Sequence, residues 1–234
     1  MGTIQHKCFE LAFEAGVRVE DRDEAVSGAM TPLQWASGLG YLEEARLLLE
    51  YGVDVNGPPG EEYGRTALQA AACSRHLGRL RMVQMLISRG ADIAAMPARK
   101  GGLTALQGAA MRGDISLANL LVGRGADVNA PCAAEEGRTV VEGAAEYGHL
   151  HMIQLLLGAG ARGYSTEGFS NAIQLAEDGG KSEVATFLRD HDALSAFIVR
   201  DLDEFAADSV VYFRLPSPGF VTVEEVSGDS NSQS

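Results

Sequence analysis

The sequence lacks the features of a secreted, membrane-spanning or disulfide-stabilised protein. Its first residues have no basic start followed by a long apolar run, so we expect no signal peptide. No apolar stretch reaches the length of a membrane-spanning helix. The three cysteines, Cys8, Cys73 and Cys132, are odd in number and widely spaced, which does not suit a disulfide framework. We expect a soluble chain in a reducing compartment, the cytoplasm, with the nucleus as the alternative.

Basic residues are few and scattered. The chain holds 19 Lys and Arg residues against 32 Asp and Glu residues, a formal net charge of −13. A nucleic-acid binder needs a basic footprint, and an anionic membrane surface makes a similar demand. We therefore predict no nucleic-acid partner and no membrane partner. The acidic excess instead favours a protein partner that carries basic groups.

Catalytic and metal-binding motifs are also missing. No glycine-rich segment carries the Gly-Lys-Ser/Thr ending of a phosphate loop, and nothing links Ser, His and Asp as a triad. His149 and His151 stand two apart, so on a helix they would not face the same way. Cys73 and His76 lack the second pair that a zinc site needs. We predict a protein that is not an enzyme and that holds no cofactor and no metal.

What the sequence does contain is an internal repeat with two phrases. A hexapeptide of the type Thr-Ala-Leu-Gln-Ala-Ala recurs at intervals of 35, 38, 35 and 32 residues. Its copies begin at Thr31, Thr66, Thr104, Thr139 and, in degenerate form, Asn171. A second phrase, of the type Leu-Leu-Leu followed by Gly-Ala-Asp-Val-Asn, comes after each of the first four copies. It occupies residues 47–56, 85–93, 120–129 and 155–161.

Each repeat is predicted to be a pair of helices. The threonine hydroxyl can cap the first helix, and apolar residues at helical spacing, such as Leu150, Ile153, Leu156 and Leu157, indicate the second. Glycine is expected to end both helices, because it tolerates the left-handed conformation. The expected ends are Gly40, Gly78, Gly113, Gly148 and Gly180 for the first helices and Gly52, Gly90, Gly125 and Gly160 for the second. Neither helix buries its apolar stripe alone, so neighbouring repeats should stack.

These phrases resemble the ankyrin-repeat family. Its signature has Thr-Pro-Leu-His at the first helix, Gly-His between the helices and Gly-Ala-Asp-Val-Asn after the second; Gly148-His149 matches the middle element. The Thr-Ala-Leu-Gln variant resembles arrays that are common in filamentous fungi. The resemblance covers roughly residues 4–195 and implies an all-α solenoid of stacked helix-turn-helix units with extended return loops.

The sequence departs from that signature in three ways. Gln replaces the usual histidine in four units, and Glu142 replaces it in the other, so the hydrogen bonds between repeats are expected to differ. Extra residues at positions 73–77 lie between the two helices of the second unit. The return loops are longer than standard, as at residues 57–64 and 133–137.

The two ends of the chain carry weaker signals. Residues 11–20 resemble the back half of a repeat, which leaves either a shortened array or an edge that a partner or a second copy completes. Residues 209–215 and 220–226 are rich in strand formers, so a β-hairpin is one option for the C-terminal tail, with residues 227–234 expected to be disordered. The resulting division is 4–30, a partial repeat and linker; 31–65, 66–103, 104–138 and 139–170, repeats 1 to 4; 171–197, a degenerate capping repeat 5; and 198–234, the tail.

The resemblance also implies where a partner would bind. In ankyrin stacks the first helices and the loop tips line a groove. The matching helix positions are Trp35, Leu39, Ala70, Gly108, Met111, Arg112, Gly143, Glu146, Tyr147 and Asp178. The matching loop tips are Tyr63, Arg99, Lys100, Glu135 and Glu136. We single out Trp35, Leu39, Tyr63, Met111, Arg112, Glu146 and Tyr147 as partner-binding residues. Trp35 is either an interface anchor beside a floor of small residues or a half-buried packing residue.

The predicted function is therefore that of a protein-binding scaffold or adaptor. Two alternatives stay open at this point: an inhibitory or regulatory subunit of an enzyme, and a structural fragment of a larger ankyrin protein. The sequence identifies neither the partner nor the oligomeric state.

Overall fold

Paired helices account for the regular structure of the residues that the computed structural model describes, 30–163 and 168–205. That part of the chain contains ten helices and no strand, only isolated bridges between loops. This confirms the all-α prediction. The repeats belong to one compact unit that ends at Asp192. The partial repeat predicted at residues 4–30 lies almost entirely outside the described residues, and the hairpin predicted within 209–226 lies wholly outside them.

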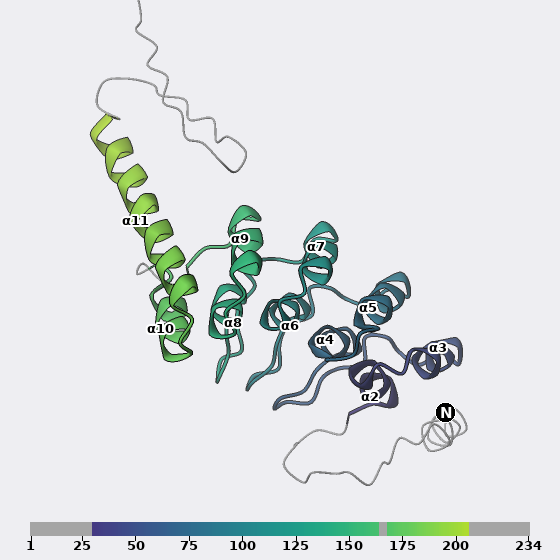
Figure 1. Ribbon diagram of the computed structural model, residues 1–234. Helices are drawn as coiled ribbons and strands as arrows, with labels where there is room; N and C mark the ends of the chain where they lie inside the picture. Colours follow the sequence, from purple (N-terminus) through teal and green to yellow (C-terminus); the bar gives the residue numbers. More distant parts are fainter. Residues whose placement is uncertain (1–29, 164–167, 206–234) are drawn as a thin grey trace, which may run out of the picture. The chain divides into compact units, whose positions relative to one another are not determined.

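Five helix pairs follow one another along the chain. They are α2 (Pro32–Leu39) with α3 (Leu42–Glu50), α4 (Ala67–Cys73) with α5 (Arg79–Ser88), α6 (Ala105–Arg112) with α7 (Ile115–Gly123), α8 (Val140–Glu146) with α9 (Leu150–Gly158), and α10 (Ser170–Asp178) with α11 (Ser182–Phe205). The first helices α2, α4, α6, α8 and α10 contact one another in a row, and long return loops project from this row (Figure 1). The last helix continues past the predicted boundary at residue 197, because residues 182–205 contain no glycine or proline to end it.

Capping boxes fix the start of the first helices. The hydroxyls of Thr31, Thr66, Thr104 and Thr139 accept from the backbone N–H three residues on, and the side chain there accepts from the threonine N–H. The glutamines at these positions also brace the return loops: Gln34 Nε2 donates to the carbonyls of Gly57 and Pro58. Gln69 and Gln107 repeat this contact with Ala95, Met96 and Pro131. Gln thus supplies both an acceptor and a donor, whereas ionised Glu142 supplies only the acceptor.

Glycine ends most of the helices, as predicted. Gly40 and Gly113 cap α2 and α6 in the left-handed conformation, with φ of 79° and 66°. The prediction for Gly78 is wrong. The chain leaves α4 early, at Ser74, whose backbone is extended, and Gly78 instead precedes α5 with φ of −80°. The inserted residues therefore carry the chain between the two helices without a left-handed turn.

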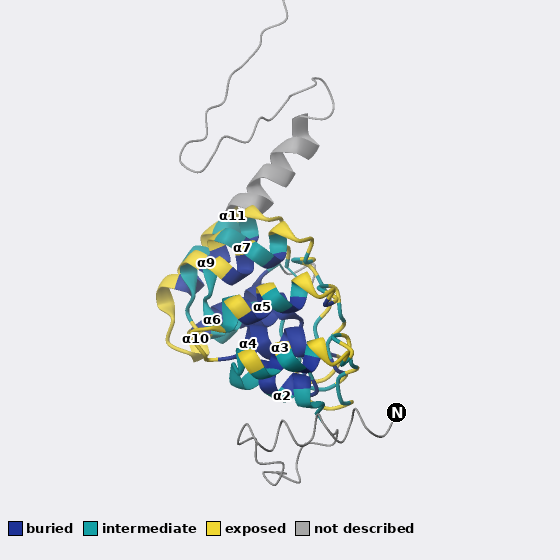
Figure 2. Ribbon diagram, turned by 90° about the vertical axis from the view of Figure 1, so that its right-hand side faces the viewer, coloured by how far each residue is buried: buried dark blue, intermediate teal, exposed yellow. Residues whose placement is uncertain are grey.

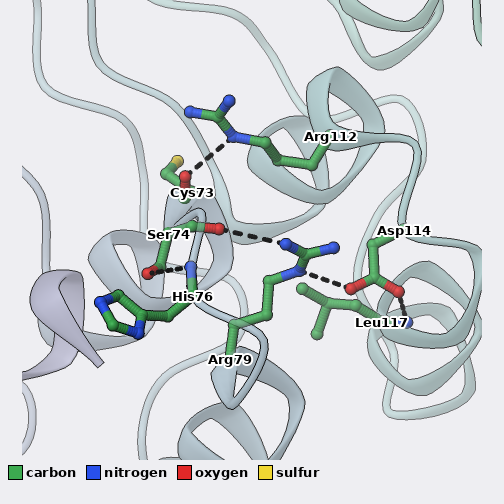
Figure 3. A network of polar contacts seen from close by, with 7 residues as sticks. All are labelled: Cys73, Ser74, His76, Arg79, Arg112, Asp114 and Leu117. Carbon is green, nitrogen blue, oxygen red and sulfur yellow. Dashed lines mark hydrogen bonds and ion pairs between the residues drawn. The ribbon is translucent and has the colours of Figure 1, made fainter. Parts of the chain in front are cut away.

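The inserted loop is held by polar contacts between repeats 2 and 3. Arg79 Nε donates to Asp114 Oδ2 at 2.6 Å, and Asp114 Oδ1 accepts from the backbone N–H of Leu117 at the start of α7 (Figure 3). Arg112 Nε donates to the carbonyl of Cys73 at 3.0 Å. Arg79 and Asp114 are mostly buried, so this ion pair is screened less than a surface pair. The insertion is thus tied to the third repeat by two arginines.

The core lies between the two layers of helices. Leu33, Leu68 and Leu106 occupy the same place in successive first helices and are each 1% exposed. In the second helices the predicted stripe is correct at Ile153 and Leu156, which are fully buried. Figure 2 shows buried residues along α2 and α4 and exposed residues along the loops. The apolar periodicity thus marks a core shared by neighbouring repeats.

Candidate partner-binding surface

The predicted partner-binding residues lie on the row of first helices and in the return loops, which together we call the first-helix face. Trp35 and Leu39 belong to α2 and are half-buried. Met111 and Arg112 end α6, and Glu146 ends α8. Tyr147 follows α8 and is 50% exposed, while Tyr63 lies in a return loop and is 43% exposed. The structure brings Met111, Arg112 and Tyr147 together and leaves Trp35 and Leu39 at the start of the described row.

The small residues expected to form an open floor are buried, so that expectation is wrong. A Cβ on Gly108 would lie 2.5 Å from Cys73 Sγ of α4, and one on Gly143 would lie 2.8 Å from Met111 Cγ of α6. Ala70 faces Gly38 of α2 in the same way and is 4% exposed. Each small residue therefore makes room for the preceding first helix.

The alignment of the repeats also indicates on which side of α2 Trp35 lies. It occupies the position of Ala70, Gly108 and Gly143, which all face the preceding helix. Trp35 therefore belongs to the side of α2 that faces away from α4. Its role as a binding anchor stays a prediction, but the reason first given for it does not hold.

A small hollow lies where repeats 2, 3 and 4 meet on the first-helix face. Its volume is about 60 Å³. We call it the arginine hollow; it is lined by Arg65, Cys73, Leu103, Gly108, Met111, Arg112 and Tyr147. Three of the predicted residues thus share one site with a second arginine. Ligand pockets for small molecules usually measure about 300 Å³ or more, so this hollow suits a single side-chain group.

Two guanidiniums dominate the charge of the arginine hollow. Burial of the Cys73 thiol raises its pKa. The positive charges of Arg65 and Arg112 lower the pKa of the same thiol, but their effect is smaller than that of burial. The Nε of Arg112 donates to the carbonyl of Cys73. The Nε of Arg65 is buried and has no hydrogen-bond partner among the described residues. Charged donors without acceptors are costly inside proteins, which marks Arg65 as a functional candidate.

The Tyr147 side chain, which lines the arginine hollow, packs against His149. Its ring stacks on His149, with centroids 6.3 Å apart and planes 14° apart. His149 Nε2 in turn lies 3.2 Å from the carbonyl of Met111, so the histidine links repeat 4 to repeat 3. His149 belongs to the Gly-His element that resembles the ankyrin signature, and in the structure it makes a contact between repeats. An exposed aromatic ring held in this way loses little conformational freedom when it binds a partner.

The return-loop tips form a ladder instead of standing free. The N–H of Tyr63 donates to the carbonyl of Lys100, and the N–H of Gly101 donates to the carbonyl of Glu135. Side chains add further contacts: Arg99 pairs with Glu135, and Lys100 Nζ lies 3.7 Å from Glu136 Oε1. The loop residues predicted to bind a partner therefore bind one another across three repeats.

Charge and hydrogen bonding shift several pKa values in this ladder, among them those of Tyr63 and Glu135. The Tyr63 hydroxyl donates to Glu136 Oε2, which raises the pKa of Tyr63 above its ordinary value. The Arg99 guanidinium beside Glu135 lowers the pKa of that carboxyl. Both ladder contacts are therefore formed at neutral pH.

Sequence reasoning missed Arg65. A signal was present in the repeats, because Arg65 and Arg138 both stand one residue before a capping threonine. Arg138 Nε donates to Glu146 Oε2 at 3.2 Å, eight residues further on. The corresponding residue eight after Arg65 is Cys73, which carries no charge to pair with it.

The acidic charge of the chain is concentrated outside repeats 1 to 4. Residues 30–163 hold 12 basic and 13 acidic residues, a net charge of −1. Residues 164–234 hold 4 basic and 13 acidic residues, a net charge of −9, and residues 1–29 contribute the remaining −3. The net charge of the chain therefore says little about the arginine hollow.

Among the described residues, no helix combines the length and the apolar character needed to cross a membrane. The His, Cys, Asp and Glu side chains of the same residues form no group of three or more that could hold a metal ion.

Two family models of ankyrin repeats match the sequence. The model described as ankyrin repeats in three copies matches residues 3–96, and the model described as ankyrin repeats in many copies matches residues 71–122. No curated protein sequence matches the chain. The sequence matches and the stacked helix pairs agree, and the chain belongs to the ankyrin-repeat family.

Proposed function

We propose that this protein is a non-enzymatic scaffold or adaptor that binds a protein partner through the first-helix face, with the arginine hollow at the centre of the contact. Ankyrin repeats are a protein-interaction module, which supports the general role. The arginine hollow supports the location, because it joins an exposed tyrosine, a methionine and two arginines. Tyr and Arg are the residue types that most often dominate interface energetics.

A cytoplasmic or nuclear location is part of this proposal. Cys73 and Cys132 are both free thiols, which suits a reducing compartment. A partner that carries basic groups remains a prediction, based on the net acidic charge of the chain.

The test compares two tyrosines of similar exposure. Tyr147 is 50% exposed on the first-helix face, and Tyr51 is 47% exposed at the end of the second helix α3. A partner captured from cell lysate is expected to bind Tyr147→Ala about thirtyfold more weakly, a cost of about 2 kcal/mol. Tyr51→Ala should bind as the parent does. Equal affinity for the parent and folded Tyr147→Ala would remove the arginine hollow as the centre of the contact, and Trp35→Ala would then test the N-terminal end of the first-helix face.

The alternative of a regulatory subunit uses the same surface. An activity assay on the captured partner, with and without the chain, separates the two roles. Inhibition that Tyr147→Ala relieves would assign the regulatory role, whereas unchanged activity would assign the adaptor role.

A further inference from the structure

We propose that the arginine hollow binds a carboxylate side chain, Asp or Glu, of the protein partner, and that Arg65 and Arg112 hold it. This inference rests on the proposed function and names the chemical group that the surface recognises. It is carried by a comparison between two repeats of the same chain.

The start of repeat 4 shows one way in which an arginine before a capping threonine is satisfied. Arg138 precedes the capping Thr139, and its Nε donates to Glu146 Oε2 at 3.2 Å. The carboxylate thus comes from the end of the first helix that follows the arginine. A charge-assisted pair of this kind is among the stronger hydrogen bonds in proteins.

The first helix of repeat 2 also follows an arginine, but it lacks the carboxylate. Arg65 precedes the capping Thr66, and the residue in the place of Glu146 is Cys73. The Nε of Arg65 is buried without a hydrogen-bond partner, although the Nε of Arg138 has one. The guanidinium of Arg65 is therefore left without the carboxylate that pairs with Arg138, and its outer nitrogens are the donors that a partner would meet.

Arg112 adds a second cation to the same place. Its Nε is fixed by the carbonyl of Cys73, which leaves the outer nitrogens of the guanidinium for another acceptor. Neither Arg65 nor Arg112 forms an ion pair with an acidic residue in the described part of the chain. No acidic side chain lines the arginine hollow. The local charge is therefore positive, although the chain as a whole is acidic.

The remaining walls suit a carboxylate carried on a short apolar stem. Met111 and Tyr147 offer apolar surface beside the two guanidiniums. The volume of about 60 Å³ matches a group of a few atoms. The Arg138–Glu146 pair shows that a carboxylate fits this register, so we favour a carboxylate over a phosphate.

The experiment uses the full chain to select binders from a random peptide library. Each enriched peptide is then made in three forms: as selected, with Gln in place of its acidic residue, and with phosphoserine there. Affinities are measured for the parent, for Arg65→Gln, for Tyr147→Ala and for Arg124→Gln. Arg124 is an exposed arginine at the end of the second helix α7, so the last variant removes the same charge away from the arginine hollow.

We expect enriched peptides to share an acidic residue at a fixed position. Its change to Gln should weaken binding to the parent and to Arg124→Gln about tenfold or more, and binding to Arg65→Gln about twofold or less. Arg65→Gln should melt at about the same temperature as the parent, because it replaces an unpaired charged group by a neutral amide, which costs less to bury. If Arg65→Gln does not fold, Arg65→Lys keeps the charge without the Nε donor and replaces it in the comparison.

Three results would overturn the carboxylate assignment. The peptides could lack a fixed acidic residue, the change to Gln could cost the same on Arg65→Gln as on the parent, or phosphoserine could bind more tightly than the acidic residue through Arg65. If Tyr147→Ala still weakens binding of these peptides, they bind the first-helix face and the proposed function stands. Peptides whose binding is unaffected by Tyr147→Ala and by Arg65→Gln would instead contradict the proposed function.

Discussion

The hydroxyl of Tyr63 donates to Glu136 Oε2 at 2.6 Å, although 73 residues separate the two in sequence. The tyrosine belongs to the return loop before repeat 2 and the glutamate to the loop before repeat 4. The ring passes over Gly101 of the intervening loop, where an added Cβ would lie 2.3 Å from Tyr63 Cδ1. Tyr63 and Glu136 both have positive φ, 51° and 58°, which is uncommon for residues other than glycine. The loops therefore accept backbone strain to form this contact.

The Tyr63–Glu136 contact predicts a pH dependence at alkaline pH. Hydrogen bonding to Glu136 raises the pKa of Tyr63, so the folded protein retains this proton to a higher pH than the unfolded chain. Its contribution to stability is present below the ordinary tyrosine pKa of about 10 and is lost as pH rises through the higher folded value. Tyrosinate absorbance of the parent minus that of Tyr63→Phe isolates this residue. In Glu136→Gln the titration should move to lower pH, and no movement would contradict the assigned cause.

Gly101 is predicted to be more sensitive to substitution than other glycines of similar conformation. Its φ is 59°, so alanine there should destabilise the protein by about 1 kcal/mol through conformational strain, and its Cβ should also displace the Tyr63 ring. Gly52 has φ of 82° and nothing within 4 Å of an added Cβ, so Gly52→Ala should lose stability through the conformational strain only. Urea unfolding measures both losses. In a Tyr63→Ala background the extra cost of Gly101→Ala should disappear; an undiminished cost would mean that the ring is not responsible.

Sequence reasoning predicted the features that depend on residues close together in the chain. The capping threonines act on N–H groups three residues away, and the glycines that end helices act on their own backbone, so both are readable in one repeat. Gly78 is the exception, because the inserted residues around Ser74 had already turned the chain out of α4. A rule based on position alone could not detect that change of path.

The parts of the candidate site that sequence reasoning missed depend on pairs of repeats. The unpaired state of Arg65 appears only when Cys73 is compared with Glu146, the residue that satisfies Arg138. The mutual pairing of the loop tips depends on how far neighbouring loops lie from each other, which no single repeat encodes. The same holds for Gly143, whose small size serves Met111 of the neighbouring helix.

Leu106 is predicted to be essential for the core of repeats 3 and 4. It is 1% exposed on α6, which packs against α8, and Leu106→Asp would bury a charge without a partner. That costs several kcal/mol, against a typical total stability of about 5–15 kcal/mol. We expect loss of the cooperative thermal transition in circular dichroism. Ser116→Asp adds the same charge at an exposed place in the first turn of α7, where the helix dipole favours it, and should melt as the parent does.

An asparagine after the second helix links some neighbouring repeats and not others, and we call this contact the latch. Asn56 Nδ2 donates to the carbonyl of Gly90, and Asn56 Oδ1 accepts from the N–H of Asp92, which joins repeat 1 to repeat 2. Asn129 makes the matching contacts with Gly160 and Arg162, which joins repeat 3 to repeat 4. The residue in this place in repeat 2 is Ala94, which has no side-chain donor or acceptor.

Ala94→Asn is therefore expected to stabilise the protein. The loop is already in the required conformation, because the N–H of Ala94 donates to Asp92 Oδ1 at 2.9 Å, just as the N–H of Asn129 donates to Asp127 Oδ1 at 2.8 Å. Two added hydrogen bonds on an exposed loop should contribute about 1 kcal/mol in urea unfolding, and Asn129→Ala should lose a similar amount. Ala94→Asp can accept from an N–H but cannot donate to a carbonyl, so it should gain less. If Asn129→Ala is destabilising and Ala94→Asn brings no gain, then repeats 2 and 3 do not meet at the spacing that the latch requires.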